Sequence, residues 1–302
     1  MDGTESPSPT LPSAAAGPGP RLAVGAIVRD EGPYLLEWIA FHRVLGVEAF
    51  FIADNASTDG GTALLAALAA TGVVRHLPFP DRPDRRPQLP AYAEILRRHR
   101  GDADWIAFLD ADEFLLPAPG AGTLRQVVAS LAARSEVGAI AVNWALYGSS
   151  GHLHAGEGLV IERFTRRAAR FRFPNRHFKS IVRSAAAVGV GPNPHVFELL
   201  PPFRTVHCDG GELSSHAGLR GLSADVPWRP LRINHYVVKS REEFMTRKRP
   251  RGRATTTGQR SPGFFDSHDM NDLPDPLSPA LVQATRRERD RLAALVGSAL
   301  PA

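Results

Sequence analysis

The chain has 302 residues, 43% of them hydrophobic and 22% charged, a composition typical of a globular protein with one large α/β domain or two small ones. Its net charge of +5 and pI near 9.8 are compatible with nucleic acid, a membrane surface or an anionic substrate, but also with a mere abundance of arginine, because acids are nearly as numerous as bases. The single cysteine, Cys208, excludes an intramolecular disulfide and favours a reducing compartment.

Residues 1–20 are rich in proline, serine, glycine and alanine, and we predict that they form a disordered tail. They lack the basic start and the apolar stretch of a secretory signal. No window of the sequence approaches the length and hydrophobicity of a transmembrane helix. We therefore expect a cytoplasmic protein without a transmembrane segment.

Residues 21–120 alternate between short apolar runs and stretches with helical spacing. Strands are predicted over Leu22–Val28, Glu48–Asp54, Val73–Phe79 and Trp105–Asp110, with helices over Pro33–Leu45, from the turn at residues 55–61 to about Ala70, and over Ala91–His99. Because these strands are apolar throughout, both faces of their sheet should be covered. The pattern predicts an α/β fold with a doubly wound, mostly parallel sheet, in which ligands bind at the carboxyl ends of the strands.

Residues 121–270 change in character and predict an α+β half of the same domain, attached to the sheet edge. A helix at Leu124–Ala133 is followed by strand candidates in residues 139–148, 159–164, 171–183, 187–191, 195–200 and 231–238. Ser240 and Glu243 have capping-box spacing at the start of a further helix. Residues 271–302 form a polar tail ending in an amphipathic helix, which we expect to pack on the domain rather than on a membrane.

The segment "WIAFLDADEFLLP", residues 105–117, places three acids between two apolar runs. In an extended chain residues two apart face the same side, so Asp110 and Asp112 can converge, with only Ala111 between them. Paired carboxylates suit Mn²⁺ or Mg²⁺, which keep coordination positions open for phosphate oxygens. Glu113 should point to the other side, where it orients a neighbour or acts in catalysis. The alternative is a solvated turn after a strand.

Polar clusters also follow the first two strands. They are Arg29, Asp30 and Glu31 after the first, and Asp54, Asn55, Ser57 and Asp59 after the second. An acid at a strand end, such as Asp54, can accept hydrogen bonds from a base or a ribose, but the same side chains can merely build an Asx turn and a helix cap. The sequence has neither a G-x-G-x-x-G fingerprint nor a Walker A lysine, which weakens dinucleotide-binding and P-loop hypotheses.

Several segments occur in an order that resembles a known family. They are "VRDEGPYLLEWIAFHRVLGV", "FIADNASTDG", "DWIAFLDADEFLLP", "WALYGSSGH", "NHYVVKSREEF" and "KRPRG". Over about residues 22–252 the chain is similar to glycosyltransferase family 2-like proteins, and more narrowly to the branch close to glycosyltransferase family 92. This resemblance implies a GT-A-type fold and transfer of a sugar from a nucleotide diphosphate sugar.

The resemblance also implies roles for individual residues. Asp54 matches the acid that contacts the nucleotide, Asp110 and Asp112 match the D-x-D motif, and His235 resembles the late histidine that completes metal binding. Donor binding is further expected of Arg29, Asp30, Glu31, Asn55, Ser57, Asp59, Gln88 and Lys179, with Mn²⁺ or Mg²⁺ as cofactor. The second half has no clear E-D pair, which leaves Glu157, Glu198 and Asp209 as candidates for the catalytic base, beside roles for Asp110, Asp112 and Glu113.

The expected reaction is a metal-assisted attack by an acceptor hydroxyl on the donor sugar, with inversion of the anomeric centre. The acceptor is an unknown glycan, lipid or small molecule. A metal-dependent phosphoesterase and a GT-A-like nucleotide-binding protein without catalysis remain open as alternatives. Nucleic acid is not expected as a partner, because aromatic residues do not interleave with the basic clusters.

Overall fold

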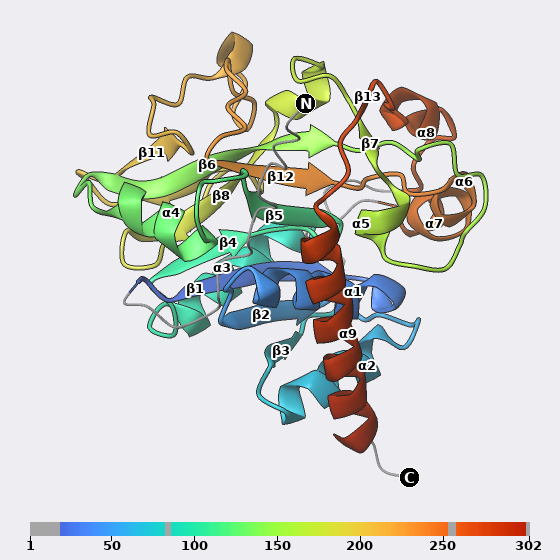
Figure 1. Cartoon of the computed structure of the whole chain (residues 1–302). Helices are drawn as coiled ribbons and strands as arrows, with labels where there is room; N and C mark the ends of the chain where they lie inside the picture. Colours follow the sequence, from blue (N-terminus) through green and yellow to red (C-terminus); the bar gives the residue numbers. More distant parts are fainter. Residues whose placement is uncertain (1–18, 82–85, 253–257, 300–302) are drawn as a thin grey trace, which may run out of the picture.

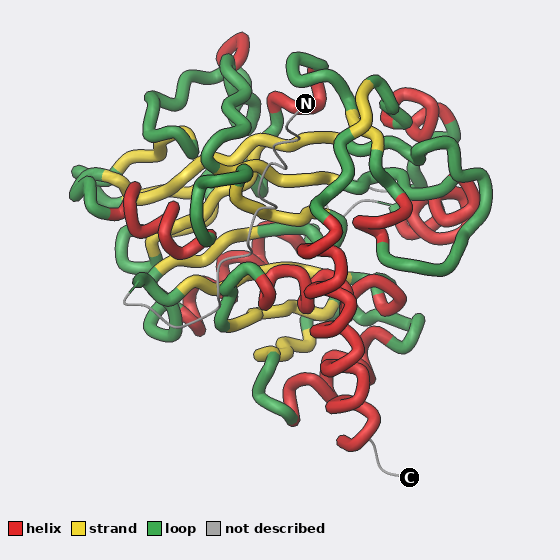
Figure 2. The backbone as a smooth tube through the Cα atoms, in the orientation of Figure 1, coloured by secondary structure: helices red, strands yellow, loops and turns green. Residues whose placement is uncertain are grey.

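The computed structural model describes residues 19–81, 86–252 and 258–299. The predicted disordered tail, residues 1–20, lies outside this part of the chain except for its last two residues. One large sheet runs through the molecule and connects its two halves (Figure 1, Figure 2). The strands of the second half therefore join the sheet at the edge of the first half and extend it.

Within the described residues the sheet has nine strands, and its main path runs in the order β3-β2-β1-β4-β8-β6-β12-β5, with β11 paired to β6. Their bounds are β1 Leu22–Val28, β2 Ala49–Asp54, β3 Val74–Pro78, β4 Trp105–Phe108, β5 Glu113–Pro117, β6 Val137–Leu146, β8 Phe178–Arg183, β11 Arg204–His207 and β12 Leu231–His235. The first four strands in this order are parallel, whereas β8 and β5 run antiparallel to their neighbours. The predicted α/β class, mainly parallel with an α+β second half, is confirmed.

Helices cover both faces of this sheet, which explains why the strands are apolar throughout. One face carries α1 (Gly32–Val44), α2 (Gly61–Ala70), α4 (Leu124–Ala132) and α9 (Pro279–Ala299). The other face carries α3 (Gln88–His99) and the hairpin of β9 (Ala187–Val190) and β10 (Phe197–Leu199). Along β1, Leu22 and Val24 pack into the first core and Ala23 and Ile27 into the second.

The sheet is strongly curled, because β5 follows β4 in the chain but lies four places away from it in strand order. In a flat sheet four strand spacings of about 4.8 Å would separate the two strands by roughly 19 Å. The residues that join them, 109–112, can span at most about 17 Å. The curl brings β12 beside β5, with His235 opposite Glu113. The late histidine therefore lies next to the acidic segment of residues 110–113.

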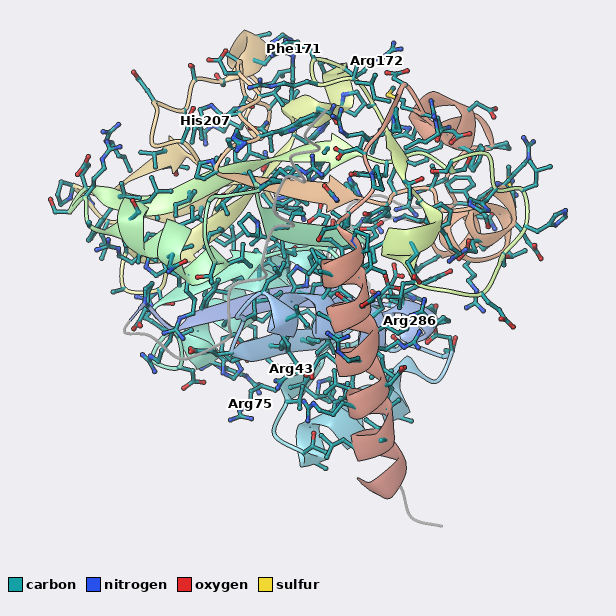
Figure 3. All side chains as sticks on the ribbon, in the orientation of Figure 1. Arg43, Arg75, Phe171, Arg172, His207 and Arg286 are labelled. Carbon is teal, nitrogen blue, oxygen red and sulfur yellow. The ribbon has the colours of Figure 1, made fainter. Side chains whose placement is uncertain are left out.

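The amphipathic C-terminal helix packs on the domain, as predicted. Leu281, Leu292 and Val296 of α9 belong to the same core as α1. Arg43 of α1 lies beside α9 (Figure 3) and pairs with Glu288 at 2.7 Å. None of the helices in the described part of the chain combines the length and hydrophobicity that crossing a membrane requires.

Residues 159–164, predicted as a strand, instead form the short helix α5 (Val160–Arg163). The Glu37 carboxylate accepts the backbone N–H groups of Val160 and Ile161 at 2.8 and 3.1 Å, so it satisfies the first turn of this helix from another element. The capping box of Ser240 and Glu243 is confirmed, and it starts α6 (Arg241–Glu243). The helices α6, α7 (Arg249–Arg251) and α8 (Gly263–His268) gather on one side of the molecule, beyond the arrowhead of β12 (Figure 1).

Candidate active site

A cavity of about 920 Å³ opens at the carboxyl ends of the parallel strands. Its wall includes Asn55 after β2, the acids that follow β4, and His235 at the end of β12. Lys248 and Arg251 reach it from the segment that contains α7. The position agrees with the general rule that open α/β sheets bind ligands at this edge.

The acids after β4 lie in a tight turn and not in the extended chain that the prediction assumed, but their side chains still divide as predicted, with Asp110 and Asp112 at the cavity and Glu113 away from it. The Glu113 backbone N–H donates to the Asp110 carbonyl at 3.0 Å, and the Asp110 N–H donates to Glu113 Oε2 at 2.9 Å. These bonds direct the Glu113 side chain inward, where it is completely buried. Asp110 and Asp112 both line the cavity, but they have different partners.

Asp110 is bound from three directions. Its Oδ1 lies 3.0 Å from Lys179 Nζ and accepts the Gln88 amide at 2.9 Å, while the Tyr92 hydroxyl lies 3.3 Å away. Burial by itself would raise the pKa of Asp110, but the Lys179 ammonium outweighs burial and lowers this pKa to about 2. Asp110 is therefore an anion whose charge is already paired inside the protein.

Lys179 connects this pair to Glu113, whose Oε2 lies 3.5 Å from its ammonium. Burial tends to lower the pKa of Lys179, yet Asp110 and Glu113 together raise it above its ordinary value. Burial raises the pKa of Glu113 to about 7 despite the nearby ammonium. Since neither Lys179 nor Glu113 lines the cavity, both residues support the turn from behind it.

Asp112 is the acid that faces the late strand. One of its carboxylate oxygens contacts the Lys248 ammonium, and the other lies 3.5 Å from His235 Nε2. Burial lowers the pKa of His235 to about 4, so its imidazole is neutral at neutral pH. A neutral imidazole and a carboxylate are both metal ligands.

The fit of a divalent metal is partial. No group of three or more His, Cys, Asp or Glu side chains within residues 19–81, 86–252 and 258–299 is placed to hold a metal ion. Asp112 and His235 nevertheless suit two adjacent coordination positions, since ligands at about 2.1 Å in octahedral geometry lie roughly 3 Å apart. The remaining positions would have to come from a ligand such as a diphosphate. Lys248 competes for the same carboxylate.

The two loops after β1 and β2 are tied to each other. The Asp30 carboxylate accepts the Thr58 N–H at 2.7 Å, and Ser57 Oγ accepts the Asp30 N–H at 3.1 Å. Asp59 accepts the Gly32 N–H at 2.9 Å and the Gly61 N–H at 3.0 Å. Asp30, Ser57 and Asp59, expected to bind the donor, lie outside the lining of the cavity and interlock the starts of α1 and α2.

Asp54 also binds neighbouring loop residues and lies outside the lining of the cavity. Its carboxylate accepts the Thr62 hydroxyl at 2.5 Å and the Ser57 N–H at 3.1 Å, and only 3% of the residue is exposed. Burial tends to raise the pKa of Asp54, but these hydrogen bonds lower it overall. Asp54 does not line the cavity, whereas the next residue, Asn55, does.

Arg29 and Glu31 do line the cavity, each with a partner. Arg29 pairs with Asp81 at 2.6 Å, and Asn55 donates to the other oxygen of Asp81 at 3.0 Å. Glu31 pairs with Arg251 at 2.5 Å. Burial would raise the pKa of Glu31, but Arg251 and nearby lysines lower it to about 2.

The candidates for the catalytic base in the second half lie elsewhere. Glu157, Glu198 and Asp209 are all absent from the described lining of the cavity. Asp209 follows β11 and accepts the Gly211 N–H at 2.9 Å. Its neighbour Cys208 is buried, and burial raises the pKa of the thiol to about 12, which suits a structural residue and not a nucleophile.

Several residues of the cavity escaped the sequence interpretation. Asp81 lies in the proline- and arginine-rich loop after β3, Trp144 lies in β6, and His195 lies in the β9–β10 hairpin. Trp144 begins the noted "WALYGSSGH" segment, which gave it no individual role, and Asp81 and His195 belong to none of the segments that carry the resemblance. Lys248 and Arg251 belong to the noted "KRPRG" segment, which gave no individual roles.

Comparison with known families gives one match over more than half of the chain. The model of glycosyltransferase family 92 matches residues 28–190. A family 92 protein of Ricinus communis is 31% identical over 195 residues, which are 64% of this chain and 34% of the relative. One of Oryza sativa subsp. japonica is 33% identical over 225 residues, or 74% of this chain and 34% of the relative. The chain thus spans about a third of the length of these relatives.

Solved structures show weaker similarity. TarS of S. aureus, in complex with UDP, aligns over 55% of this chain and 47% of its own, with 12% identity and a TM-score of 0.33. Glucosyl-3-phosphoglycerate synthase of Mycobacterium tuberculosis, in complex with Mn²⁺, UDP and its product, aligns over 46% and 50%, with 21% identity and a TM-score of 0.28. Similarity this low carries no argument about the present chain.

Proposed function

Because the chain belongs to glycosyltransferase family 92, we propose that it transfers a sugar from a nucleoside diphosphate sugar to an acceptor hydroxyl. The observation that carries this proposal is the cavity at the strand ends, where Asp112 and His235 lie beside the cations Lys248 and Arg251. A nucleoside diphosphate is an anion that gains charge as it leaves the sugar. Fixed cations and hydrogen-bond donors at this position favour that leaving group.

Each part of the donor is assigned to the residues that line one region of the cavity. The nucleoside lies at the ends of β1 and β2, near Asn55 and Asp81, and the diphosphate lies toward Lys248 and Arg251. Asp112 and His235 would hold Mn²⁺ or Mg²⁺, which supplies additional positive charge next to the diphosphate when bound. Asp110 keeps the turn in place through its bonds to Lys179 and Gln88. The acceptor and the cytoplasmic location stay predictions without a structural argument, as does inversion.

Two measurements test this function. In a thermal-shift screen with UDP, GDP, CDP and ADP, each with and without Mn²⁺, one nucleotide should raise the melting temperature selectively, because a ligand stabilises the state to which it binds. The matching sugar nucleotides should then release the diphosphate in the presence of simple sugar acceptors. Asp112→Asn should abolish this release while keeping the fold.

The alternative without catalysis has one supporting observation. The four acids that line the described part of the cavity each have a cationic partner: Glu31 with Arg251, Asp81 with Arg29, Asp110 with Lys179, and Asp112 with Lys248. A carboxylate in an ion pair is a poor proton acceptor. Tight binding of a nucleoside diphosphate without turnover of any sugar nucleotide would favour this alternative. Hydrolysis of nucleotides without sugar transfer would favour a phosphoesterase instead.

A further inference from the structure

Sugar transfer needs a group that takes the proton of the acceptor hydroxyl, and the acids of the cavity are all paired with cations. The described lining of the cavity also contains four histidines: His177, His195, His235 and His268. An imidazole can serve as a general base when it is neutral and when one of its nitrogens is open to the substrate.

His195 meets both conditions. Its Nδ1 lies 2.7 Å from the Phe178 carbonyl oxygen, which can only accept a hydrogen bond, so Nδ1 carries the proton and Nε2 carries a lone pair. Among the described residues, none forms a hydrogen bond with Nε2. Burial and the Lys179 ammonium lower the pKa of His195 to about 3, so the ring is neutral in the ligand-free protein, and it becomes an effective proton acceptor once the anionic donor binds beside it and raises this pKa.

The ring is held firmly in its position. The backbone N–H of His195 donates to Asn193 Oδ1 at 3.0 Å, and its carbonyl accepts the Ser180 hydroxyl at 2.6 Å. The Trp144 ring meets the imidazole edge-on, with centroids 5.7 Å apart. These contacts fix the direction of Nε2, as a catalytic group requires.

His195 is also linked to the acids at the end of β4. Phe178, which binds its Nδ1, is followed in β8 by Lys179, which binds Asp110. Two consecutive residues of one strand therefore position the imidazole and the Asp110 turn relative to each other. A donor sugar held by its diphosphate next to that turn would lie within the same cavity as Nε2.

Resting on the glycosyltransferase function proposed above, we propose that His195 is the catalytic base. The acceptor O–H bond breaks and its proton bonds to Nε2, while the oxygen forms a new bond to the anomeric carbon. The bond between that carbon and the diphosphate oxygen breaks, and its electron pair leaves with the nucleoside diphosphate. The anionic donor favours the imidazolium that forms, since a nearby opposite charge stabilises it.

The other histidines of the cavity are less suited to this role. His235 faces Asp112 at 3.5 Å, where it is proposed to bind the metal. The His268 ring stacks on Phe264 with centroids 3.8 Å apart, and the His177 ring stacks on Trp144 at 4.7 Å. His177 is the nearest rival, because its Nδ1 also lies 3.0 Å from a carbonyl oxygen, that of Pro174.

The test compares His195→Asn with His177→Asn. The asparagine amide can donate to the carbonyl in place of Nδ1, but it has no nitrogen at the Nε2 position. Release of UDP is measured from UDP-glucose and UDP-galactose, with water and methyl glycosides as acceptors, beside UDP affinity by calorimetry and melting temperature. For His195→Asn we expect turnover to fall about 100-fold or more, the usual contribution of a general base. UDP affinity should stay within about twofold of wild type.

His177→Asn should keep turnover within about tenfold of wild type. His195→Gln provides a second variant in case the asparagine variant does not fold, because its amide nitrogen has no basic lone pair. If either His195 variant kept the turnover of the wild type, His195 would not be the base, and the proposed function would stay intact. Loss of UDP affinity in proportion to turnover would overturn it too, because it would indicate a binding or structural role. If the wild-type protein bound no nucleoside diphosphate, both proposals would be wrong.

Discussion

Lys248 contacts one carboxylate oxygen of Asp112, while His235 lies 3.5 Å from the other. The lysine is 7% exposed and ends a π-helical turn, Phe244–Lys248, a geometry often found at functional sites. Burial, together with Arg260 and Arg251, lowers the pKa of Lys248 well below its ordinary value. The Asp112 carboxylate in contact with this amine favours its protonated form, so in the protein without ligands the lysine neutralises the carboxylate charge that a metal ion would otherwise neutralise.

Lys248→Met should therefore raise the affinity of the ligand-free protein for Mn²⁺, because it removes a competing cation. We expect a gain of about tenfold, corresponding to roughly 1.4 kcal/mol. Calorimetric titration with Mn²⁺ in the absence of nucleotide measures it. Arg247→Met, which removes the same charge from an exposed neighbour, serves as the control. Equal Mn²⁺ affinity in wild type and Lys248→Met would show that the lysine does not compete.

His235→Ala should raise the Mn²⁺ concentration required for transfer by about 10- to 100-fold, since the variant loses one of two protein ligands. Because the pKa of His235 is lowered to about 4, Mn²⁺ binding to the wild type should stay level down to about pH 5. Mn²⁺ titrations of activity are read beside melting curves. An unchanged Mn²⁺ requirement together with a lower melting temperature would mean that His235 only packs against Trp144.

Asp54→Asn should act mainly on stability, because the carboxylate binds Thr62 and the Ser57 backbone away from the cavity. Weakening these buried hydrogen bonds should cost about 1–3 kcal/mol, measurable by urea unfolding. The matched variant is Asp81→Asn, whose carboxylate lines the cavity. It should lower the affinity for whichever nucleoside diphosphate stabilises the wild type, with little effect on stability. A selective loss of that affinity in Asp54→Asn would support the nucleotide contact that the family resemblance implies.

Glu243→Gln should make the free energy of unfolding depend less on pH in the acid range. Glu243 accepts two hydrogen bonds from Arg163, at 2.8 and 2.9 Å, and one from Tyr34 at 2.9 Å. Burial would raise the pKa of Glu243, but these partners lower it from its ordinary value near 4.5 to about 2. The folded state thus prefers the ionised form, and the stabilisation present above pH 4.5 is lost as the pH falls toward 2.

We expect this contribution to be roughly 2 kcal/mol. Urea unfolding at several pH values compares the wild type with Glu243→Gln and with Glu242→Gln, an exposed neighbour on the same short helix. In the Glu242 variant the free energy of unfolding should fall between pH 5 and about pH 2 as steeply as in the wild type. If the free energy of unfolding of Glu243→Gln fell with pH as steeply as that of the wild type, Glu243 would not be the source of this pH dependence.

The first half of the fold could be predicted because β1, β2 and β4 are buried on both faces and each reads as a continuous apolar run. The second half was harder, since tertiary contacts decide its local structure. Residues 160–163 have an apolar start that suits a strand, but Glu37 of α1 binds their N–H groups and favours a helix. The curl of the sheet follows from strand order, which no local pattern reveals.

At the site, too, residues marked by a local sequence pattern could be predicted, and residues brought there by tertiary structure could not. Asp112, Gln88 and His235 were predicted because they stand at strand or helix ends in an order shared with a family, and all three line the cavity. Lys248 and His195 could not be predicted. One depends on a π-helical turn and the other on a hairpin loop, so that only folding brings both of them to the cavity.

The pairing of β12 with β5 has a consequence for engineering. His235 lies opposite Glu113, and side chains alternate between the two faces along a strand. A slip of one residue would put Asn234 or Tyr236 opposite Glu113 and turn the imidazole to the other face. A chain with the same residues but with β12 shifted by one position would therefore not bring His235 to Asp112. Chimeras that exchange the second half between relatives should therefore be aligned on the residue opposite Glu113, and not on loop length.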